Sequence, residues 1–376
     1  MSKLLVDNPF VIGKYISDDY FCDREKETEF LYKQIVNGRN VAMLSPRRMG
    51  KTGLIYHLFG QKEVAQRYHV FFTDIYATQT IEEFVYSLSS AIYVGQRKSL
   101  KKRFWDLVKS LRLAFRTDAV TGEPELSLSL GDIKEPEKTL DEIFEYLESA
   151  DKPCIVAIDE FQQIGSYKGV RAEALLRTKI QQCRQTHFIF AGSKKHLMAN
   201  MFNSPAKPFY QSVISIGINP LPKDAYVKFA ISKFKEYGKE VEPELVGMVY
   251  DHFDGVTWFV QVIMNELFAM TGQGETCKTA KFDAAFQNAV DVQAVNYEQI
   301  LSNLSLKQKA LVQAIAKEGT VTGITRSGFI KKYNLDSSST VQSALRPLVN
   351  NDIVLQDGNA YRLYDYFFAS WLKRRF

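Results

Sequence analysis

A chain of 376 residues with 45% hydrophobic and 13% aromatic residues is globular throughout and long enough for two or three domains. Its net charge of +5 permits a polyanionic partner but does not demand one. The four cysteines and five histidines show no metal-ligand spacing, and no apolar run reaches the roughly 18 residues of a membrane helix. The N-terminal "MSKLLVDNPFVIG" has no long apolar core, so we expect a cytoplasmic protein with reduced cysteines and no membrane contact.

The first half of the chain alternates between helical and strand patterns. Residues 24–36 place their apolar positions on one helical face, and a short apolar run at 40–44 precedes a loop and a helix at 52–59. Four more strands are expected at 68–76, 154–159, 187–193 and 212–218. Helices are expected at 80–95, 139–149 and 169–185. This order predicts right-handed crossovers and a mainly parallel sheet with helices on both faces.

The loop after the first strand contains a Gly-Lys-Thr sequence. The usual phosphate-binding pattern is G-x-x-x-x-G-K-[ST], and here Ser45 replaces the first Gly. Gly50 lets the backbone approach phosphates, Lys51 neutralises the β/γ charge, and the Thr52 hydroxyl is a Mg²⁺ ligand. The following helix N-terminus also favours phosphate, although a chance Gly-Lys-Thr is the alternative. The predicted nucleotide-binding residues of this loop are Ser45, Pro46, Arg47, Arg48, Met49, Gly50, Lys51, Thr52 and Gly53.

A second acidic motif supports this prediction. "CIVAIDEFQQI" ends a strand in Asp159 and Glu160. In such a pair the Asp holds Mg²⁺ through water, while the Glu orients or deprotonates the attacking water. The gap of about a hundred residues between the two motifs leaves room for one extra strand. That length is typical of the branch of P-loop proteins that inserts a strand between the two motif strands and carries a catalytic Glu.

Segment 97–116 is rich in basic residues, with eight Lys or Arg against one Asp. Its apolar positions fall on one helical face. We interpret it as an amphipathic helix packed on the core with a solvated basic face; contact with nucleic acid or an acidic partner is the alternative.

The C-terminal part shows a different order of elements. From 223 to about 300 the pattern is helical only, and from 304 to 365 it predicts three helices and a β-hairpin with an Asp-Gly turn, the order of a winged helix-turn-helix. The hydroxyls at 337–340, together with Gln342, Ser343 and Arg346, could contact bases or phosphates. A helix with one Arg and an internal Pro347 is electrostatically poor for this role, and winged helices also dock proteins.

Six segments carry a family resemblance: "NPF", "FCDREKE", "SPRRMGKT", "IDEFQQ", "FAGSKKHLM" and "PFYQS". In this order they resemble the archaeal-type ATPase family, AAA+-related P-loop ATPases allied to signalling ATPases with numerous domains and to origin-recognition initiators. The resemblance covers nearly the whole chain. It implies that "NPFVIG" and Phe21 to Arg24 line the adenine side, that Ser193 is a polar sensor near the γ-phosphate, and that 223–300 is a helical lid. From the residues alone, Ser193 could equally cap the next helix and Phe21 could be core packing.

We therefore expect an α/β fold: a parallel-sheet, AAA+-like P-loop ATPase core at 1–222, a helical lid at 223–302 and a winged helix at 303–376. The expected cofactors are ATP and Mg²⁺. The expected catalytic residues are Lys51, Glu160 and Ser193, and the expected Mg²⁺ ligands are Thr52 and Asp159.

The leading hypothesis for function is a nucleotide-dependent switch. It would hydrolyse ATP slowly, persist in ATP-bound and ADP-bound states, and act through an unidentified protein effector. Slow turnover is expected because the usual place of a neighbour's catalytic Arg, before the fifth strand, offers only Lys207 and Gln211; Arg171, Arg177 and Arg184 are the substitutes. The alternative is a DNA-binding regulator with a structural ATP site, binding weakly through 97–116 or the winged helix. A motor ring is a third hypothesis.

Overall fold

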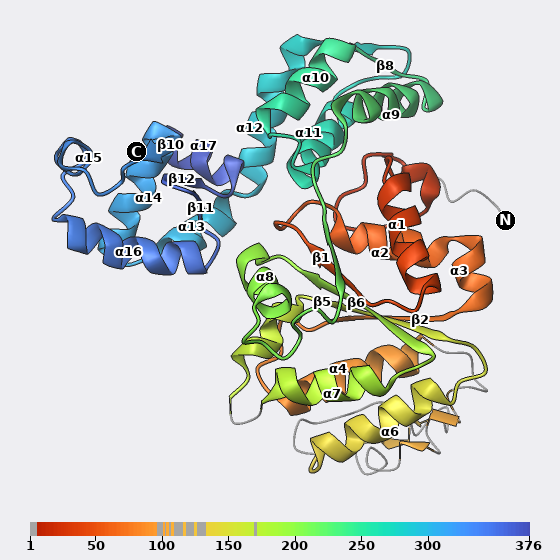
Figure 1. Ribbon diagram of the computed structural model, residues 1–376. Coiled ribbons are helices and arrows are strands. Elements are labelled where there is room, and N and C mark those ends of the chain that lie inside the picture. The colour runs from red at the N-terminus through yellow and green to blue at the C-terminus, as the bar shows by residue number, and fades with distance from the viewer. Residues whose placement is uncertain are drawn as a thin grey trace. The chain divides into compact units, whose positions relative to one another are not determined.

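The computed structural model describes residues 6–95, 101, 103–104, 107–108, 116–117, 124–125, 133–168 and 171–376 (Figure 1). The chain divides into two compact units. Gly13–Leu221 form one unit, and the segment that ends at Ile12 forms the other together with Pro222–Phe376. None of the helices in the described ranges is both long and apolar enough to cross a membrane.

The first unit is built on a five-stranded parallel sheet in the order β2-β5-β6-β1-β7. Its strands are β1 (Val41–Leu44), β2 (His69–Asp74), β5 (Cys154–Asp159), β6 (Thr186–Gly192) and β7 (Ile214–Gly217). Every residue of β1 and β5 is buried, because the sheet is covered on both faces and these strands consist almost entirely of apolar residues. The predicted fold class is confirmed, and β6 is the strand inserted between the two motif strands β1 and β5.

Helices cover both faces of this sheet (Figure 1). They are α1 (Glu25–Val36), α2 (Lys51–Gly60), α3 (Lys62–Arg67), α4 (Ile81–Val94), α6 (Pro136–Glu148), α7 (Ala172–Gln182) and α8 (Lys195–Asn203). Figure 1 shows α1 and α2 on one face, with α4 and α7 on the other. The described residues of this unit also form two short 3₁₀ turns, Asp18–Tyr20 and Phe161–Ser166, and the two-residue strands β3 (Arg116–Thr117) and β4 (Pro124–Glu125).

The basic segment 97–116 lies largely outside the described residues. Phe104 and Val108, which the helical pattern places on its apolar face, are buried in the core. The predicted end of the helix is wrong, because Arg116 belongs to β3, which pairs antiparallel with β4. Backbone pairing with a neighbouring segment has no signal in the local hydrophobic period, so the sequence pattern could not predict it.

A cluster of phenylalanine rings packs beneath the carboxyl ends of β5 and β6. Phe161, which directly follows β5, lies with its ring centroid 4.4 Å from that of Phe190 on β6 and 5.4 Å from that of Phe209. All three rings are fully buried. Burying such a ring contributes about 2–3 kcal/mol, so this cluster fixes the course of the chain immediately after β5.

The second unit begins with a helical part. Its helices are α9 (Lys223–Glu236), α10 (Pro243–His252), α11 (Thr257–Ala269), α12 (Phe282–Val292) and α13 (Ala294–Ser302), with a 3₁₀ turn at Thr279–Lys281. The prediction of helices alone is wrong in one detail. The strands β8 (Glu240–Val241) and β9 (Thr276–Cys277) pair in parallel, and the Glu240 backbone N–H donates to the Glu275 carbonyl at 2.9 Å. Two-residue strands are too short to show an alternating pattern.

The predicted winged helix is confirmed. It comprises α14 (Leu306–Glu318), β10 (Thr320–Thr322), α15 (Ser327–Lys332), α16 (Ser338–Asn350), β11 (Val354–Asp357), β12 (Ala360–Leu363) and α17 (Tyr366–Arg375). The strands form an antiparallel sheet in the order β10-β12-β11, and Gly358 at φ +56° makes the turn between β11 and β12. A capping box begins α14, with Ser305 and Gln308 each bonding the other's backbone.

Residues 6–12 pack inside the helical part of the second unit. The fully buried Phe10 ring lies 5.5 Å from Phe234 and 5.9 Å from Phe268, measured between ring centroids. The Asn8 side-chain amide donates to the Asn265 carbonyl at 2.9 Å, and the Asn265 amide donates to the Phe10 carbonyl at 2.8 Å. This segment therefore does not belong to the sheet-containing unit, although the expected ATPase core began at residue 1.

Candidate nucleotide site

The phosphate loop joins β1 to α2 and is shaped by two left-handed residues. Arg48 has φ +65° and Gly50 has φ +87°, and α2 begins at Lys51. The buried Lys51 ammonium donates to the carbonyls of Ser45 (3.2 Å) and Pro46 (2.9 Å). Burial lowers the pKa of Lys51, while the negative charges of Asp159 and Glu160 raise it. The loop thus holds one buried cation against its own carbonyls at a helix N-terminus, the arrangement that binds phosphate.

Thr52 and Asp159 meet across the sheet, as the two motifs predict. The Thr52 hydroxyl donates to Asp159 Oδ2 at 2.7 Å, and the Glu160 N–H donates to Asp159 Oδ1 at 2.9 Å. Burial raises the pKa of the Asp159 carboxyl, against the lowering effects of Thr52 and Lys51.

The Thr52 hydroxyl and the Asp159 carboxylate are oxygen groups of the kind that could hold Mg²⁺, which takes one or two protein oxygens and completes its shell with phosphate and water. Among the described residues, no cluster of three His, Cys, Asp or Glu that could hold a metal occurs.

Glu160 and Ser193 are brought into contact by the neighbouring strands β5 and β6. Glu160 lies in the left-handed region at φ +56°, and its Oε2 accepts a hydrogen bond from the Ser193 hydroxyl at 2.6 Å. Ser193 does not cap the next helix: the N-cap of α8 is Lys194, which makes no side-chain capping bond. The Ser193 hydroxyl thus contacts the Glu160 carboxylate, and its expected role as a polar sensor near the γ-phosphate stays a prediction.

Gln162 is a member of this cluster to which the sequence pattern gave no role. Its side-chain amide donates to Glu160 Oε2, and the residue is only 5% exposed. A Cβ at Gly192 would approach Gln162 Oε1 to 2.5 Å, so the Gln162 side chain would have to shift if any other residue ended β6.

Phe21 covers the first turn of α2, on the side expected to hold adenine. Its ring stacks on His57 at a centroid distance of 4.5 Å and an interplanar angle of 23°. A Cβ at Gly53 would approach the Phe21 ring to 3.2 Å, so Gly53 allows the close packing. The Asp18 carboxylate bridges this group, accepting from the Tyr15 hydroxyl at 2.6 Å and lying 2.9 Å from His57 Nδ1.

Arg24 is tied to the loop backbone. It is 3% exposed, and one guanidinium nitrogen donates to the carbonyls of Asn219 (2.7 Å) and Met49 (3.3 Å). The other pairs with Glu27 at 2.6 Å. Contact of Phe21 and Arg24 with a nucleotide stays a prediction, and "NPF" packs in the other unit.

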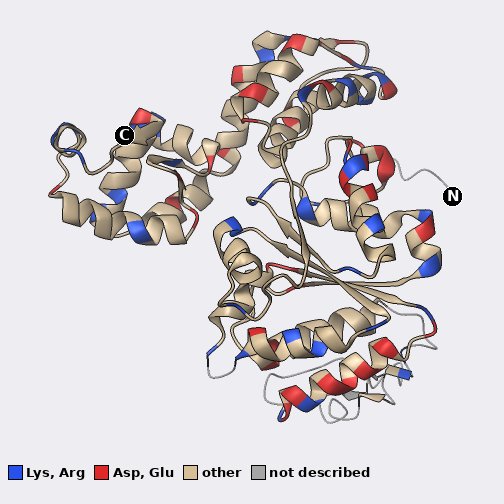
Figure 2. Ribbon diagram, in the orientation of Figure 1, with Lys and Arg blue, Asp and Glu red and all other residues tan. Residues whose placement is uncertain are grey.

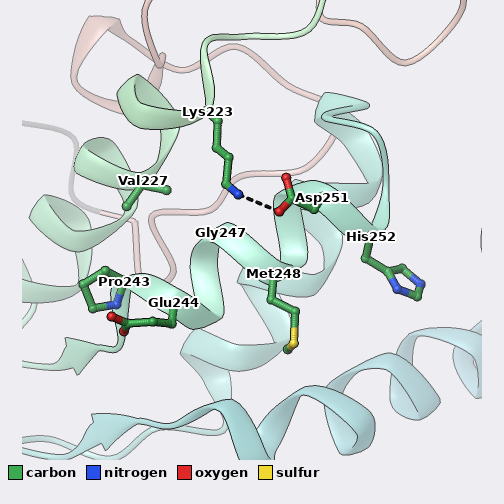
Figure 3. Close-up of a pocket in the computed structure, with 8 residues that line it drawn as sticks. All are labelled: Lys223, Val227, Pro243, Glu244, Gly247, Met248, Asp251 and His252. Atoms are coloured by element: carbon green, nitrogen blue, oxygen red, sulfur yellow. Dashed lines mark hydrogen bonds and ion pairs between the residues drawn. The ribbon is translucent and has the colours of Figure 1, made fainter.

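A separate open depression of about 760 Å³ lies in the second unit, between α9 and α10 (Figure 3). Lys223 and Asp251 pair across it at 2.5 Å. Apolar atoms of Val227, Pro243 and Met248 line much of the rest. None of the residues predicted for the nucleotide site lies there.

Comparison with known proteins agrees with this geometry. The sequence profile of an ATPase domain found predominantly in archaea matches residues 21–261. The chain belongs to this archaeal-type ATPase family. The profile of a probable winged helix domain matches residues 295–374 of this P-loop ATPase. A search of curated protein sequences found no match to the chain.

Solved structures of low sequence identity share the fold of this archaeal-type ATPase. The Walker-type ATPase of Pyrococcus abyssi is 20% identical, with a TM-score of 0.66, over 97% of this chain and 99% of that one. The Aeropyrum pernix ORC2 protein, solved as ADPNP-ADP complexes, is 14% identical, with a TM-score of 0.60, over 97% and 96% of the two chains. The Aeropyrum pernix ORC1 protein, solved in complex with DNA, is 13% identical, with a TM-score of 0.51, over 95% and 94%.

Proposed function

We propose that this archaeal-type ATPase binds ATP with Mg²⁺, hydrolyses it slowly and works as a nucleotide-dependent switch. The observation that carries the proposal is the convergence of Lys51, the Thr52–Asp159 pair and the Ser193–Glu160 pair. They lie at the carboxyl ends of the adjacent strands β1, β6 and β5 or in the loop that follows β1.

Each side chain has a distinct task in hydrolysis. Lys51 exchanges the loop carbonyls for the β/γ-phosphate oxygens. Thr52 and Asp159 would hold Mg²⁺, which neutralises phosphate charge when bound. Glu160 orients the attacking water and accepts its proton, while Ser193 holds the Glu160 carboxylate at the end of β6.

Slow turnover follows from the state of Glu160. Its Oε2 accepts hydrogen bonds from both Ser193 and Gln162, so the carboxylate must give up or rearrange these bonds before it can act on water. Breaking a hydrogen bond to a charged group costs about 1.5–3 kcal/mol, which corresponds to roughly tenfold to hundredfold in rate.

Two substitutions test the proposal by separating binding from hydrolysis. Lys51→Ala should lose ATP binding, because the β/γ charge is no longer neutralised, while Glu160→Gln should keep ATP bound and nearly abolish turnover. Binding is measured by equilibrium dialysis with labelled ATP, and hydrolysis by phosphate release. Arg39→Met, at the exposed entrance to β1, serves as a control in the same unit. Undiminished hydrolysis by Glu160→Gln would remove this residue as the group that activates water.

A second candidate function is DNA binding through the winged helix, and charge favours it. Residues 303–376 hold eleven Lys or Arg and five Asp or Glu, an excess of six, whereas the whole chain has a net charge of +5. At the start of α16, however, the Ser337 hydroxyl accepts from the Thr340 N–H as a cap and also bonds Ser339. These hydroxyls are therefore already engaged within the helix.

The basic segment 97–116 offers a weaker case for nucleic acid. Arg103 donates to the Ser149 carbonyl at the end of α6, and Figure 2 shows acidic residues along that helix. This placement supports packing on the core.

We expect any DNA binding to be weak, salt-sensitive and directed at phosphates. Affinities at low and physiological salt are compared for wild type, Arg346→Ala and a triple Ala variant at positions 101–103. A tight, sequence-specific complex that the triple variant leaves unchanged and Arg346→Ala weakens would favour the DNA-binding function over the switch.

A further inference from the structure

Arg47 is the phosphate-loop side chain that crosses from β1 to the end of the neighbouring strand β6. Its Nε donates to the Ser193 hydroxyl at 3.4 Å, and its guanidinium carbon lies 5.3 Å from the centre of the Tyr76 ring. The aromatic face and the hydroxyl hold the guanidinium on the side of the loop that faces β6 and β5, where a cation attracts developing negative charge.

A chain of contacts connects Arg47 to the group that acts on water. Ser193 receives the hydrogen bond from Arg47 and gives its own to Glu160 Oε2 at 2.6 Å. On the loop side, the charge of Arg47 opposes that of Lys51 and lowers the Lys51 pKa, in addition to the larger effect of burial. Arg47 therefore lies between the lysine that marks the β/γ-phosphates and the carboxylate that activates water, where the γ-phosphate of a bound nucleotide belongs.

Three of the four other cations considered for this role are engaged or placed elsewhere; the fourth, Arg171, is the N-cap residue of α7. Lys207 pairs with Glu173 at 2.9 Å. Arg177 donates to Gln181 one turn further along α7. Arg184 precedes β6 and so lies at the opposite, amino-terminal edge of the parallel sheet from the phosphate loop.

We propose that Arg47 is a catalytic arginine that this chain supplies to its own γ-phosphate, so that the site is complete within one molecule. The inference rests on the ATP hydrolysis proposed above. In this step the water oxygen bonds to the γ-phosphorus as the bond from that phosphorus to the β–γ bridging oxygen breaks. The water proton passes to Glu160, and ADP and inorganic phosphate leave. The two-pronged guanidinium of Arg47 leaves Ser193 to contact the γ-phosphate oxygens, where charge accumulates.

This assignment has a kinetic consequence. An arginine supplied within the molecule supports turnover on the order of 10⁻² per second in related chemistry, whereas one supplied by a second protein gives rates of several per second. Specific activity should then be slow and independent of protein concentration. Arg47 bonds the Ser193 hydroxyl, and that hydroxyl bonds Glu160. When Arg47 moves to an arriving γ-phosphate, Ser193 loses its bond from Arg47, so phosphate binding is linked to the group that holds Glu160.

The test replaces Arg47 by Met, which keeps the length of the side chain and removes its charge and donors. We expect kcat to fall by about 10³-fold, with ATP affinity changed by less than about tenfold, because the charge is needed chiefly in the transition state. The Arg47→Lys variant keeps the charge without the paired donors and should recover only part of the rate. Arg39→Met removes an arginine at the opposite end of β1, so its kcat and its ATP affinity should equal those of wild type.

A second measurement separates catalysis from loop stability. ADP with aluminium fluoride imitates the transferring phosphoryl group, so Arg47→Met should lose affinity for this complex in proportion to kcat while its ADP affinity stays near that of wild type. Equal losses for ADP and for the fluoride complex would show that Arg47 only shapes the loop and would overturn the proposal.

Mixing Arg47→Met with Lys51→Ala distinguishes a site completed within one molecule from one completed by a neighbour. The mixture should remain inactive, whereas recovered activity would show an arginine supplied in trans. If wild type itself does not hydrolyse ATP, the proposed function fails. If wild type hydrolyses ATP and Arg47→Met is equally active, only the role of Arg47 fails.

Discussion

Replacing Arg24 by Met should loosen the nucleotide site without touching any residue assigned to hydrolysis. The Arg24 guanidinium donates to the Met49 carbonyl in the phosphate loop and to the Asn219 carbonyl after β7, and pairs with Glu27. The Arg24 side chain is 4% exposed and that of Glu27 24%, so water can replace the lost partner at Glu27 but not fully at the two carbonyls.

The magnitude follows from these three contacts. A hydrogen bond to a charged group contributes about 1.5–3 kcal/mol, and removing one member of a buried ion pair costs about 3–5 kcal/mol. Glu27 is partly exposed and the bond to the Met49 carbonyl is long, at 3.3 Å. The free energy of unfolding should therefore fall by about 3 kcal/mol, near the lower end of the range for a buried ion pair. Amide exchange in β1 and α2 should then accelerate by roughly a hundredfold if it proceeds through opening of this unit.

Hydrogen–deuterium exchange is the suitable assay because it resolves the two units separately. Amides of α9 to α17 belong to the other unit and provide an internal reference. Arg39→Met, which removes an exposed arginine with a 3.4 Å bond to Gln34, should change stability by less than about 0.5 kcal/mol. Arg24→Lys should retain part of the stability, since an ammonium can reach one carbonyl. Unchanged exchange in β1 and α2 for Arg24→Met would refute the reasoning.

Three further outcomes are expected. Asp159→Asn should stabilise the nucleotide-free protein while abolishing Mg²⁺-dependent hydrolysis, because it removes a buried carboxylate yet keeps groups that can bond Thr52 and the Glu160 N–H. Burial raises the folded-state pKa of Asp159, so wild type loses stability as pH rises from the ordinary carboxyl range through that raised pKa. In thermal unfolding, Asp159→Asn should therefore melt at a higher temperature than wild type at neutral pH, but not at a pH well below the ordinary carboxyl pKa range. Gln162→Met should raise kcat by about tenfold with KM nearly unchanged in steady-state assays, because Glu160 then has one hydrogen bond fewer to give up before it acts on water and no phosphate ligand is lost. Wild-type specific activity should stay well under about one per second and flat when protein concentration is varied; a steep rise would favour a motor ring.

The sheet and the winged helix could be predicted because their signals are local. The apolar runs that became β1 and β5 are buried at every position, as parallel strands between two helical layers must be. The Asp357-Gly358 pair marks the β11–β12 turn because glycine adopts the positive φ that such a turn needs. The residues of the phosphate loop follow a fixed spacing, so Lys51 and Thr52 could be assigned their tasks from the sequence.

What the sequence could not reveal depends on contacts between distant segments. Gln162 shows its role only where β6 ends in a glycine beside it. Arg24, which the family resemblance places on the adenine side, also bonds the carbonyl of Asn219, 195 positions away. Phe10 likewise belongs to the core of a helical unit formed more than two hundred residues later. None of these partners lies within the window in which hydrophobic period or motif spacing carries information.

The chain passes between the two units at two places, after Ile12 and after Leu221. Asn219, two residues before the second passage, is bonded to Arg24, which also holds the phosphate loop at Met49. Phe21, nine residues beyond the first, packs on α2 at Gly53. The phosphate loop is thus bonded through Arg24 to a residue shortly before the second passage, and a ring shortly after the first passage packs on α2.

Within the second unit the helical part and the winged helix are bound together by aromatic packing. The Phe367 ring of α17 lies 5.6 Å from Phe253 and 5.4 Å from Phe259, and Arg374 bonds Asp291 on α12. Buried rings packed in this way do not slide independently, so the winged helix follows the helical part. In the proposed switch, an effector bound to the winged helix would therefore move with the helical part as one body.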